Sequence, residues 1–508
     1  MSGRTKADGM AFPAGTASRR YPGPTRLAGI AEWLRSALFL PPVARTLGWR
    51  QVAGGAVFVV LGAAVSLART SGPGALNTIW IEDANNFLQD ALHESVMTTL
   101  TTQMNGYYDL VPRAVTAIAM TFPLTWVPGI MSACAAVEYS LFGLIAYIAS
   151  GPHLRSPWLR LLVAAPACLV PLGYTQANND LATVQFVALY GIFWLLLWRP
   201  ATRAGQLAAP VIMLCSTLSS ILPLLLAPLV AARLIADRSK VSIAIAVCWA
   251  AGLVTQWSVQ LRGMSNRQVS GWTNPLWVLG NYATRVVPRA LFGERALGGS
   301  GTDGDGHPLP LVIPNMAVHT ALTWGAWAIV AAVIIIALVR LTAPDWPLAV
   351  TALLFSVLLF VGEIVNNLPV VQPRYVIAPA LLVYAGIVAM LRPRGVADAA
   401  GPPDAPDGEA ATPDGQAATG DTRARIPVLR PRSAALAWCP VVVFTLVLAV
   451  TCGFNYRVTN ARSESPAWTS IVAAATEKCM KPGMADYYYH HHGWWQFKIP
   501  CGRVRSSS

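Results

Sequence analysis

Two neighbouring carboxylates, Glu82 and Asp83, follow the first long apolar stretch in the sequence WIEDANNF. A carboxylate within hydrogen-bond reach of a hydroxyl group can take up its proton as that hydroxyl attacks. The same pair can instead stabilise the start of a helix, because N-terminal N–H groups attract negative charge. The helical spacing of Asp83, Phe87 and Asp90 predicts a short amphipathic helix on the bilayer surface. A catalytic base and a helix cap on a solvated face are therefore the two interpretations of this pair.

Two arginines complete the set of residues that can do chemistry. Arg113 ends the sequence GYYDLVPR, and Arg374 lies in QPRYVIAP. The planar guanidinium group suits phosphate oxygens, but an arginine at this depth can also simply extend toward lipid headgroups. Arg374 is nearly the only cation in the predicted short outer loops, so an anionic ligand would compensate its charge. For both arginines, phosphate binding and plain anchoring stay open.

The composition requires that these residues sit in a membrane protein. Of the 508 residues, 54% are hydrophobic and only 12% are charged, which excludes one or two soluble domains. The net charge of +13 is scattered along the chain, which argues against a nucleic-acid partner. A bilayer pass needs about 17–25 apolar residues. Such runs lie near 52–69, 128–150, 158–173, 181–198, 241–259, 317–340, 346–363, 375–391 and 434–452.

The stretch 207–234 is too long for one pass and short for two. Basic residues flank it on both sides, which predicts a pair of short helices that re-enter from the cytosol. Its expected tip is the polar cluster Ser216, Thr217, Ser219 and Ser220. The sequence thus predicts an all-α polytopic protein with about eleven transmembrane helices.

The distribution of arginine and lysine predicts the direction of these passes. Basic residues concentrate in the first 50 residues and in alternate short loops, which belong on the cytosolic side of the cell membrane. The expected parts are a basic cytosolic tail (1–50), a membrane core (51–391) and a flexible cytosolic linker (392–433). A last transmembrane helix (434–452) and an extracytoplasmic tail (453–508) follow. The core carries outer loops at 70–113 and 260–316.

Acids inside predicted spans are functional hypotheses by default. Glu138 lies within the run 128–150, and Glu363 lies at the outer end of 346–363. Glu138 is either a proton-relay group or, as we favour, a hydrogen-bonded structural acid. In the outer tail, Cys479 and Cys501 are predicted to form a disulfide, because that compartment is oxidising. No metal or other cofactor is expected, since no CxxC motif occurs and three successive histidines point to different faces.

The acidic pair, the outer loop and the late Arg-Tyr together resemble the GT-C superfamily of membrane glycosyltransferases, and the tail resembles that of bacterial phage-type glucosyltransferases. The residues that carry the resemblance are WIEDANNF (80–87), GYYDLVPR (106–113) and QPRYVIAP (372–379). It implies transfer of a sugar from a polyprenyl-phosphate carrier to an envelope glycan or lipid acceptor. Asp83 is then the expected base, with Glu82 as the alternative. Expected substrate-binding residues are Arg374, Tyr375, Arg113, Asp109 and Tyr107. The loop lacks a DxD sequence, which argues against a metal-dependent mechanism.

The alternative class is a lipid or glycan transporter or flippase, which the number of passes also fits. Transporters place their polar groups near the bilayer midplane and often contain internal repeats, and no repeat is visible here. A polar cavity on the outer side, lined by Asp83 and Arg374, would favour the transferase. A cavity in the middle of the bilayer would favour the transporter.

Overall fold

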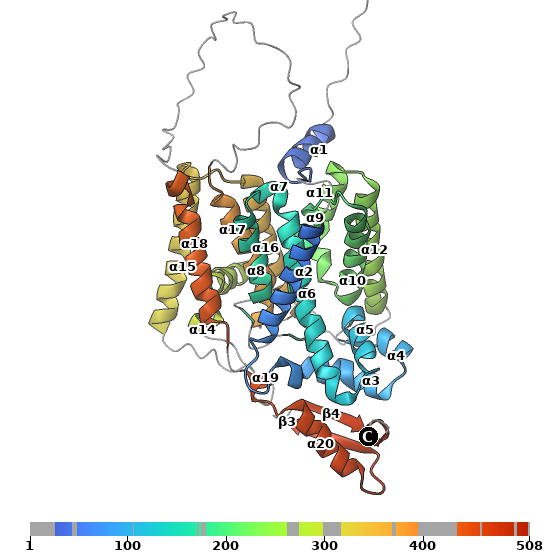
Figure 1. Cartoon of the computed structure of the whole chain (residues 1–508). Coiled ribbons are helices and arrows are strands. Elements are labelled where there is room, and N and C mark those ends of the chain that lie inside the picture. Colours follow the sequence, from blue (N-terminus) through green and yellow to red (C-terminus); the bar gives the residue numbers. More distant parts are fainter. Residues whose placement is uncertain are drawn as a thin grey trace, which may run out of the picture.

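The computed structural model describes residues 26–42, 48–104, 106–169, 172–173, 179–261, 274–297, 316–367, 372–394, 434–457, 460–491 and 495–505. Within these ranges the chain is mostly helical, with two small two-stranded sheets (Figure 1). Seven helical segments are long and apolar enough to cross a membrane. They contain α2 (Trp49–Leu67), α6 (Val127–Ala149), α12 (Lys240–Leu261), α15 (Met316–Leu338), α16 (Trp346–Asn367), α17 (Ile377–Met390) and α18 (Ala434–Phe454).

The remaining predicted passes are shorter helices, so a count of eleven is not established. They are α8 (Pro157–Leu169), α9 (Val184–Leu197), α10 (Arg203–Ser219) and α11 (Ala227–Ala236), which follows the 3₁₀ turn η4 (Leu222–Leu226). The 14 residues of α9 span only about 21 Å at 1.5 Å per residue. Nearly all of α9 is buried, because this helix is apolar on every side and runs through the centre of the bundle.

The predicted pair of short helices in 207–234 is present as α10 and α11, and the chain doubles back between them through η4; we call this segment the helical hairpin. Arg233, near the end of α11, is buried and donates hydrogen bonds to the carbonyls of Leu196 and Trp198, which lie at the end of α9, shortly before α10 begins. Both ends of the hairpin therefore lie at the same end of the bundle. Its tip is at Ser219 and Ser220, within the predicted polar cluster.

The segments from the first outer loop gather at one end of the bundle, called here the loop end, whereas α1 (Arg26–Ala37) lies at the other (Figure 1). They are η1 (Ala75–Asn77), the π-helical turn η2 (Asp83–Leu88), α3 (Gln89–His93), α4 (Val96–Thr101), β1 (Gln103–Met104), β2 (Tyr107–Tyr108) and α5 (Leu110–Ala119), followed by η3 (Leu124–Trp126). The short helix α7 (Gly151–Leu154) connects α6 to α8.

The single surface helix expected from Asp83 onward is wrong. Asp83, Phe87, Leu88 and Leu92 are all buried, and the helix ends at His93. The C-terminal residues pack on this segment and bury the face that the helical periodicity predicted to be exposed to solvent. The second outer loop contains α13 (Pro275–Asn281), η5 (Tyr282–Val286) and α14 (Val287–Leu297). The 3₁₀ turn η6 (Pro373–Val376) directly precedes α17. Most of the predicted linker 392–433, the first 25 residues and residues 298–315 lie outside the described residues.

The C-terminal residues form a small module, defined as residues 460–505. It contains α19 (Ala461–Glu464), α20 (Trp468–Cys479), the antiparallel strands β3 (Asp486–His491) and β4 (Trp495–Pro500), and α21 (Cys501–Arg505). The strands alternate: Tyr487, Tyr489, Phe497 and Ile499 are buried, whereas Tyr488 and Lys498 are exposed. The buried side chains form the core of this module with Trp468.

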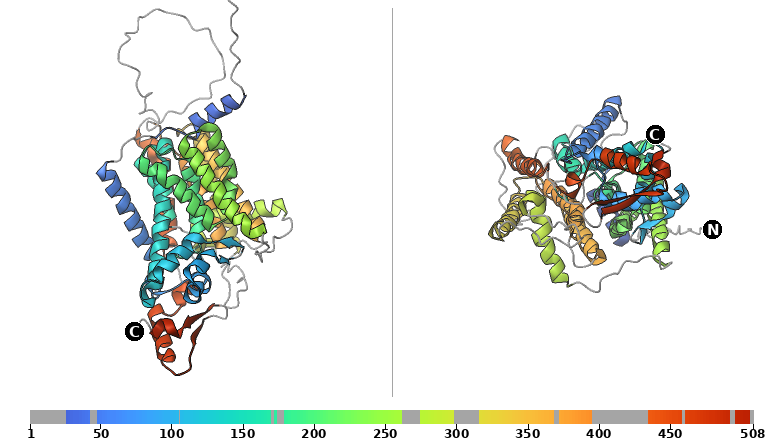
Figure 2. Two further views of the ribbon diagram at one scale, coloured as in Figure 1. Left: turned by 90° about the vertical axis from the view of Figure 1, so that its right-hand side faces the viewer. Right: turned by 90° about the horizontal axis from the view of Figure 1, so that it is seen from below.

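The C-terminal module packs on the first outer loop. The indole Nε1 of Trp468 donates to the carbonyl of Leu124 at 2.8 Å, and the backbone N–H of Lys498 donates to Gln89 Oε1 at 2.7 Å. Gly72 has a positive φ of 68°, and a Cβ there would collide with the carbonyl oxygen of Ser463. Seen from below, the module lies over the loop end (Figure 2, right). In the side view, α2 stands on the outside of the bundle (Figure 2, left).

The predicted Cys479–Cys501 disulfide is present and joins the end of α20 to the start of α21. The other cysteines are free. Because the bridge closes a loop with a sequence separation of 22, the chain-entropy model assigns it about 3 kcal/mol.

We predict that Cys501→Ser lowers the unfolding free energy of the C-terminal module by about 3 kcal/mol, because the unfolded module regains loop entropy. Limited proteolysis of the membrane-embedded protein measures this, with cleavage expected between residues 480 and 500. Cys439→Ser, at an exposed free cysteine, is the control. Equal protease resistance of the Cys501→Ser and Cys439→Ser variants would contradict the prediction.

Candidate functional site

Asp83 is a buried hydrogen-bond acceptor rather than a cap of its own helix. It is 2% exposed, and η2 has no side-chain cap. Its two carboxylate oxygens accept the backbone N–H groups of Leu181 and Ala182, both at 3.0 Å. These N–H groups belong to the turn that leads into α9. Asp83 therefore stabilises the entry of a different helix, about 100 residues away in the sequence.

The turn at 179–183 is built from its own polar side chains. Asn179 has φ of 54°, a left-handed conformation that asparagine tolerates, and its amide is held by hydrogen bonds with Ser66. Asp180 Oδ1 accepts the N–H of Thr183 at 2.9 Å. This local side-chain-to-backbone bond fixes the residues that precede α9, so the two N–H groups that Asp83 accepts point toward it.

Arg462 of the C-terminal module lies beside the same turn. Its guanidinium donates to the carbonyls of Asn179, Ala75 and Thr78 and to the hydroxyl groups of Thr78 and Ser132, at 2.6–3.0 Å. It is 1% exposed, and the carboxylates of Asp180 and Asp83 act on its charge. A buried cation is thus placed between two buried acids.

Burial raises the pKa of Asp83 well above the usual aspartate value, and the nearby charge of Asp180 adds to this. The backbone N–H groups and Arg462 act in the opposite direction because they favour the carboxylate. Asp83 is therefore a titratable group whose position is fixed by the fold. Its role as a base stays a prediction.

Glu82 and Arg374 form an ion pair between the first outer loop and the segment before α17. Arg374 Nη1 lies 2.6 Å from Glu82 Oε1, and Trp80 Nε1 donates to the other oxygen of Glu82. The charge of Arg374 is thus compensated within the chain, which the sequence did not predict. Its Nε is buried and has no hydrogen-bond partner among the described residues. Tyr375 packs beside the guanidinium and against the ring of Phe186.

Arg113 does not extend to the headgroups, as a plain membrane anchor would. It is 1% exposed, pairs with Asp90 at 2.7 Å and donates to the carbonyl of Thr99. It also lies over the ring of Phe87. This arginine holds the start of α5 against α3 and α4, and it is enclosed by protein where a lipid phosphate would need access.

Asp109 is a buried acid with an unsatisfied carboxylate oxygen. It is 2% exposed, it makes no side-chain cap to α5, and its Oδ2 has no hydrogen-bond partner among the described residues. Burial raises its pKa well above the usual aspartate value; the charge of Arg113 opposes this, and the charges of Glu82 and Asp83 add to it. A buried, unpartnered carboxyl group with a raised pKa is characteristic of functional acids and bases.

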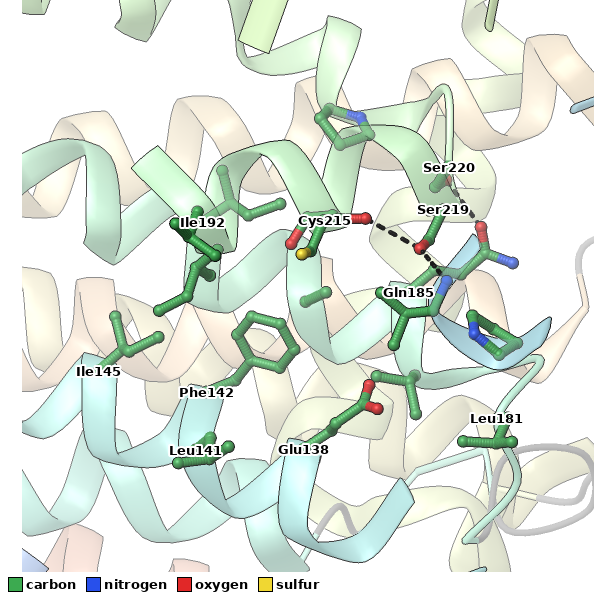
Figure 3. A pocket seen from close by; sticks show the side chains of 18 of the residues that line it. Glu138, Leu141, Phe142, Ile145, Leu181, Gln185, Ile192, Cys215, Ser219 and Ser220 are labelled. Carbon is green, nitrogen blue, oxygen red and sulfur yellow. Dashed lines mark hydrogen bonds between the residues drawn. The ribbon is translucent and has the colours of Figure 1, made fainter. Parts of the chain in front are cut away.

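Asp109 lines a cavity of about 390 Å³ between α6, α9 and α10, called here the α6–α10 groove. The groove has a polar part near the loop end, formed by Asp109, Glu138, Gln185, Ser219 and Ser220, of which Figure 3 labels the last four. From there it continues between apolar side chains, among them Phe142, Ile145 and Ile192 (Figure 3). Along α6 it runs from Glu138 to Ile148, which is about 15 Å of helix.

The α6–α10 groove opens toward the outside of the bundle. Its rim includes Leu141 and Ile148 of α6 and Val211 of α10, which are 43%, 39% and 58% exposed. Its floor is α9, which is buried. Because the rim residues are apolar and α6 is long and apolar enough to cross a membrane, the opening would face the hydrocarbon region when α6 spans a bilayer.

Neither Asp83 nor Arg374 lines the groove. Gln185, in the polar part of the groove, donates to the hydroxyl of Tyr107 at 3.4 Å and accepts from Ser220 at 2.7 Å. Tyr107 in turn lies within electrostatic range of Arg374. The structure thus brings together Asp109, Tyr107, Arg374, Tyr375 and Glu82, and it leaves Arg113 outside this group.

The expected hydrogen-bonded role of Glu138 is wrong: no side chain or backbone group among the described residues bonds its carboxylate, which faces the groove (Figure 3). Glu363, which the sequence places at the outer end of its span, is buried. Within the ranges that the structure describes, no three His, Cys, Asp or Glu side chains are placed to hold a metal ion.

Sequence reasoning missed Asp180, Gln185 and Arg462. Asp180 carries a usable signal, because an aspartate directly before an apolar run, here 181–198, is typical of a helix entry. Gln185 and Arg462 carry none, since their partners lie far away in the sequence.

The sequence matches no protein-family model and has no significant similarity to any curated protein.

We predict that Asp83→Asn lowers the unfolding free energy by about 1–3 kcal/mol. The amide keeps one acceptor, so it leaves one of the two buried N–H groups of the 181–182 turn without a partner. The measurement is thermal unfolding of the detergent-solubilised protein. The control is Glu94→Gln, which changes an exposed acid in the same loop. A melting temperature for Asp83→Asn equal to that of the control would refute the structural role.

Proposed function

We propose that this chain is an integral-membrane glycosyltransferase that moves a sugar from a lipid-phosphate carrier to an acceptor at the loop end, which faces the extracytoplasmic side. The observation that supports it best is Asp109, a buried acid with an unpartnered carboxylate oxygen at the polar end of an apolar groove. Arg374, which lies outside the groove beyond Gln185 and Tyr107, supplies the cation. The proposal agrees with the resemblance of residues 80–87, 106–113 and 372–379 to the GT-C superfamily.

In this proposal Asp109 is the base. The acceptor hydroxyl oxygen forms a bond to the anomeric carbon of the sugar, and the bond from that carbon to the phosphate oxygen breaks. The phosphate leaves with the electron pair, and the hydroxyl proton passes to Asp109. The raised pKa of Asp109 suits this task, because a base is most effective when its pKa lies near the working pH. Asp83, the base first expected, instead shapes the turn before α9 and raises the pKa of Asp109 by its charge.

Arg374 is proposed to hold the phosphate of the carrier. Its unpartnered Nε can donate to a phosphate oxygen while Nη1 keeps its bond to Glu82. Glu82 then orients the guanidinium and prevents it from turning away. A fixed cation of this kind stabilises the charge that develops on the departing phosphate.

We expect Asp109→Asn to lower the transfer rate by about 10²–10⁴-fold, because the amide cannot accept the proton.

The unfolding free energy of the Asp109→Asn variant at neutral pH should equal or exceed that of the native chain. With a raised pKa, Asp109 favours folding at low pH and loses that contribution as pH rises through its folded pKa, and the amide removes this loss. The acid limb of the native rate profile should lie well above pH 4, since the base must be deprotonated. Envelope glycans and lipids from cells carrying each variant are compared by mass spectrometry, with Glu94→Gln, at an exposed acid of the same loop, as the control. Unchanged products in the Asp109→Asn strain would refute Asp109 as the base.

We expect Arg374→Ala to weaken binding of polyprenyl phosphate by about tenfold or more, and Arg374→Lys to weaken it less. Lysine keeps the charge but loses the fork that serves Glu82 and a phosphate together. The uncharged polyprenol of the same length is the matched probe, whose binding should not change. Equal loss for both probes would show that the substitution acts through packing rather than through the phosphate.

A lipid flippase is the second candidate, because the α6–α10 groove extends along much of α6. Proteoliposomes that contain fluorescent lipids separate the two functions. Rapid loss of fluorescence from both leaflets after addition of dithionite would favour the flippase, and protection of the inner leaflet would favour the transferase.

A further inference from the structure

We propose that the α6–α10 groove binds the acceptor, and that this acceptor is a lipid with an uncharged, hydroxyl-bearing head. The inference rests on the proposed function, since it assigns one of the two substrates of that reaction to the groove. It commits to one occupant, whose hydrocarbon chain lies between α6 and α10 and whose head lies beside Asp109 and Glu138.

The apolar part of the groove fits a hydrocarbon chain. Its walls are side chains such as Phe142, Ile145 and Ile192, and its rim opens toward the bilayer at Leu141 and Val211. A lipid can therefore enter sideways without leaving the membrane. Burial of each CH₂ group between protein side chains in a bilayer gains little, so affinity and selection must come from the head.

The polar part of the groove selects against a phosphate. Two acids, Asp109 and Glu138, line it, and no lysine, arginine or histidine of the described ranges does. A phosphate placed there would lie beside like charges or would force both acids to take up protons, and either costs free energy. The cation suited to phosphate, Arg374, lies outside the groove, beyond Gln185 and Tyr107. The charges of the two sites therefore direct the phosphate of the carrier to Arg374 and the uncharged acceptor to the groove.

The same part of the groove suits a hydroxyl group. The carboxylate of Asp109 is nine-tenths or more buried and its Oδ2 has no partner among the described residues. Glu138 likewise presents its carboxylate to the groove without a hydrogen bond from any described residue. Hydroxyl donors on the lipid head would satisfy both acids, and the hydroxyl at Asp109 would be the one that attacks.

The test uses two photoactivatable probes with the same diazirine-bearing chains: a diacylglycerol, which ends in a hydroxyl, and the corresponding phosphatidic acid. The full chain is held in phosphatidylcholine nanodiscs, and labelled peptides are identified by mass spectrometry. We expect the diacylglycerol to label residues of α6, α9 and α10 that line the groove, and the phosphatidic acid to label them about tenfold less. The double variant Asp109→Asn, Glu138→Gln should remove this difference.

Two neighbouring residues of α10 provide the matched control for occupancy. Ala208→Trp fills the groove from its exposed edge and should lower labelling by about tenfold, whereas Leu207→Trp, at a site that is 72% exposed and does not line the groove, should leave it unchanged. Equal labelling by both probes, or no effect of Ala208→Trp in a protein with normal thermal unfolding, would overturn the inference. These readouts need no sugar transfer. Groove labelling without any transfer would refute the proposed function alone, and transfer without selective labelling would refute the lipid acceptor alone.

Discussion

The buried guanidinium of Arg462 is surrounded by five oxygen acceptors from three distant parts of the chain: Ala75 and Thr78, Ser132, and Asn179. Removing such a charge from water costs several kcal/mol unless hydrogen bonds and opposite charges offset it. Here the five acceptors and the acids Asp83 and Asp180 provide that compensation. The first outer loop, α6 and the turn before α9 are therefore held in one arrangement by a residue of the C-terminal module.

This arrangement decides which acids are structural and which are available for chemistry. Asp83 gives both oxygens to backbone N–H groups, Glu82 is paired with Arg374, and Asp90 is paired with Arg113. Asp109 and Glu138 lack such partners among the described residues and share the α6–α10 groove. Since a buried polar group without a partner destabilises the fold, its presence next to a cavity points to a ligand that supplies the missing hydrogen bonds.

The helical hairpin of α10 and α11 shows how the membrane core and the loop end are connected. Arg233 closes the hairpin at one end by binding the carbonyls that precede α10, and Ser219 and Ser220 bring its tip to Val111 and Gln185 at the other. The tip thus forms part of the polar end of the groove, while the body of α10 forms one wall. A single supersecondary element supplies both the lipid-facing and the polar surfaces.

The sequence by itself determined the features that depend on local composition. Apolar runs predicted a polytopic helical protein, and basic flanks predicted the pair of helices at 207–234. The expected position of the tail in an oxidising compartment predicted the Cys479–Cys501 bridge. Hydrophobicity and charge patterns extend over neighbouring residues, so they can be recognised in a single amino-acid sequence. Only the tertiary structure decided the partners of Asp83, Arg113 and Arg374. Each partner lies on a different helix or turn from the residue that it binds, so the local sequence does not reveal it. Periodicity placed Asp83 on a solvated face, and packing of the C-terminal module over the loop end buried it instead.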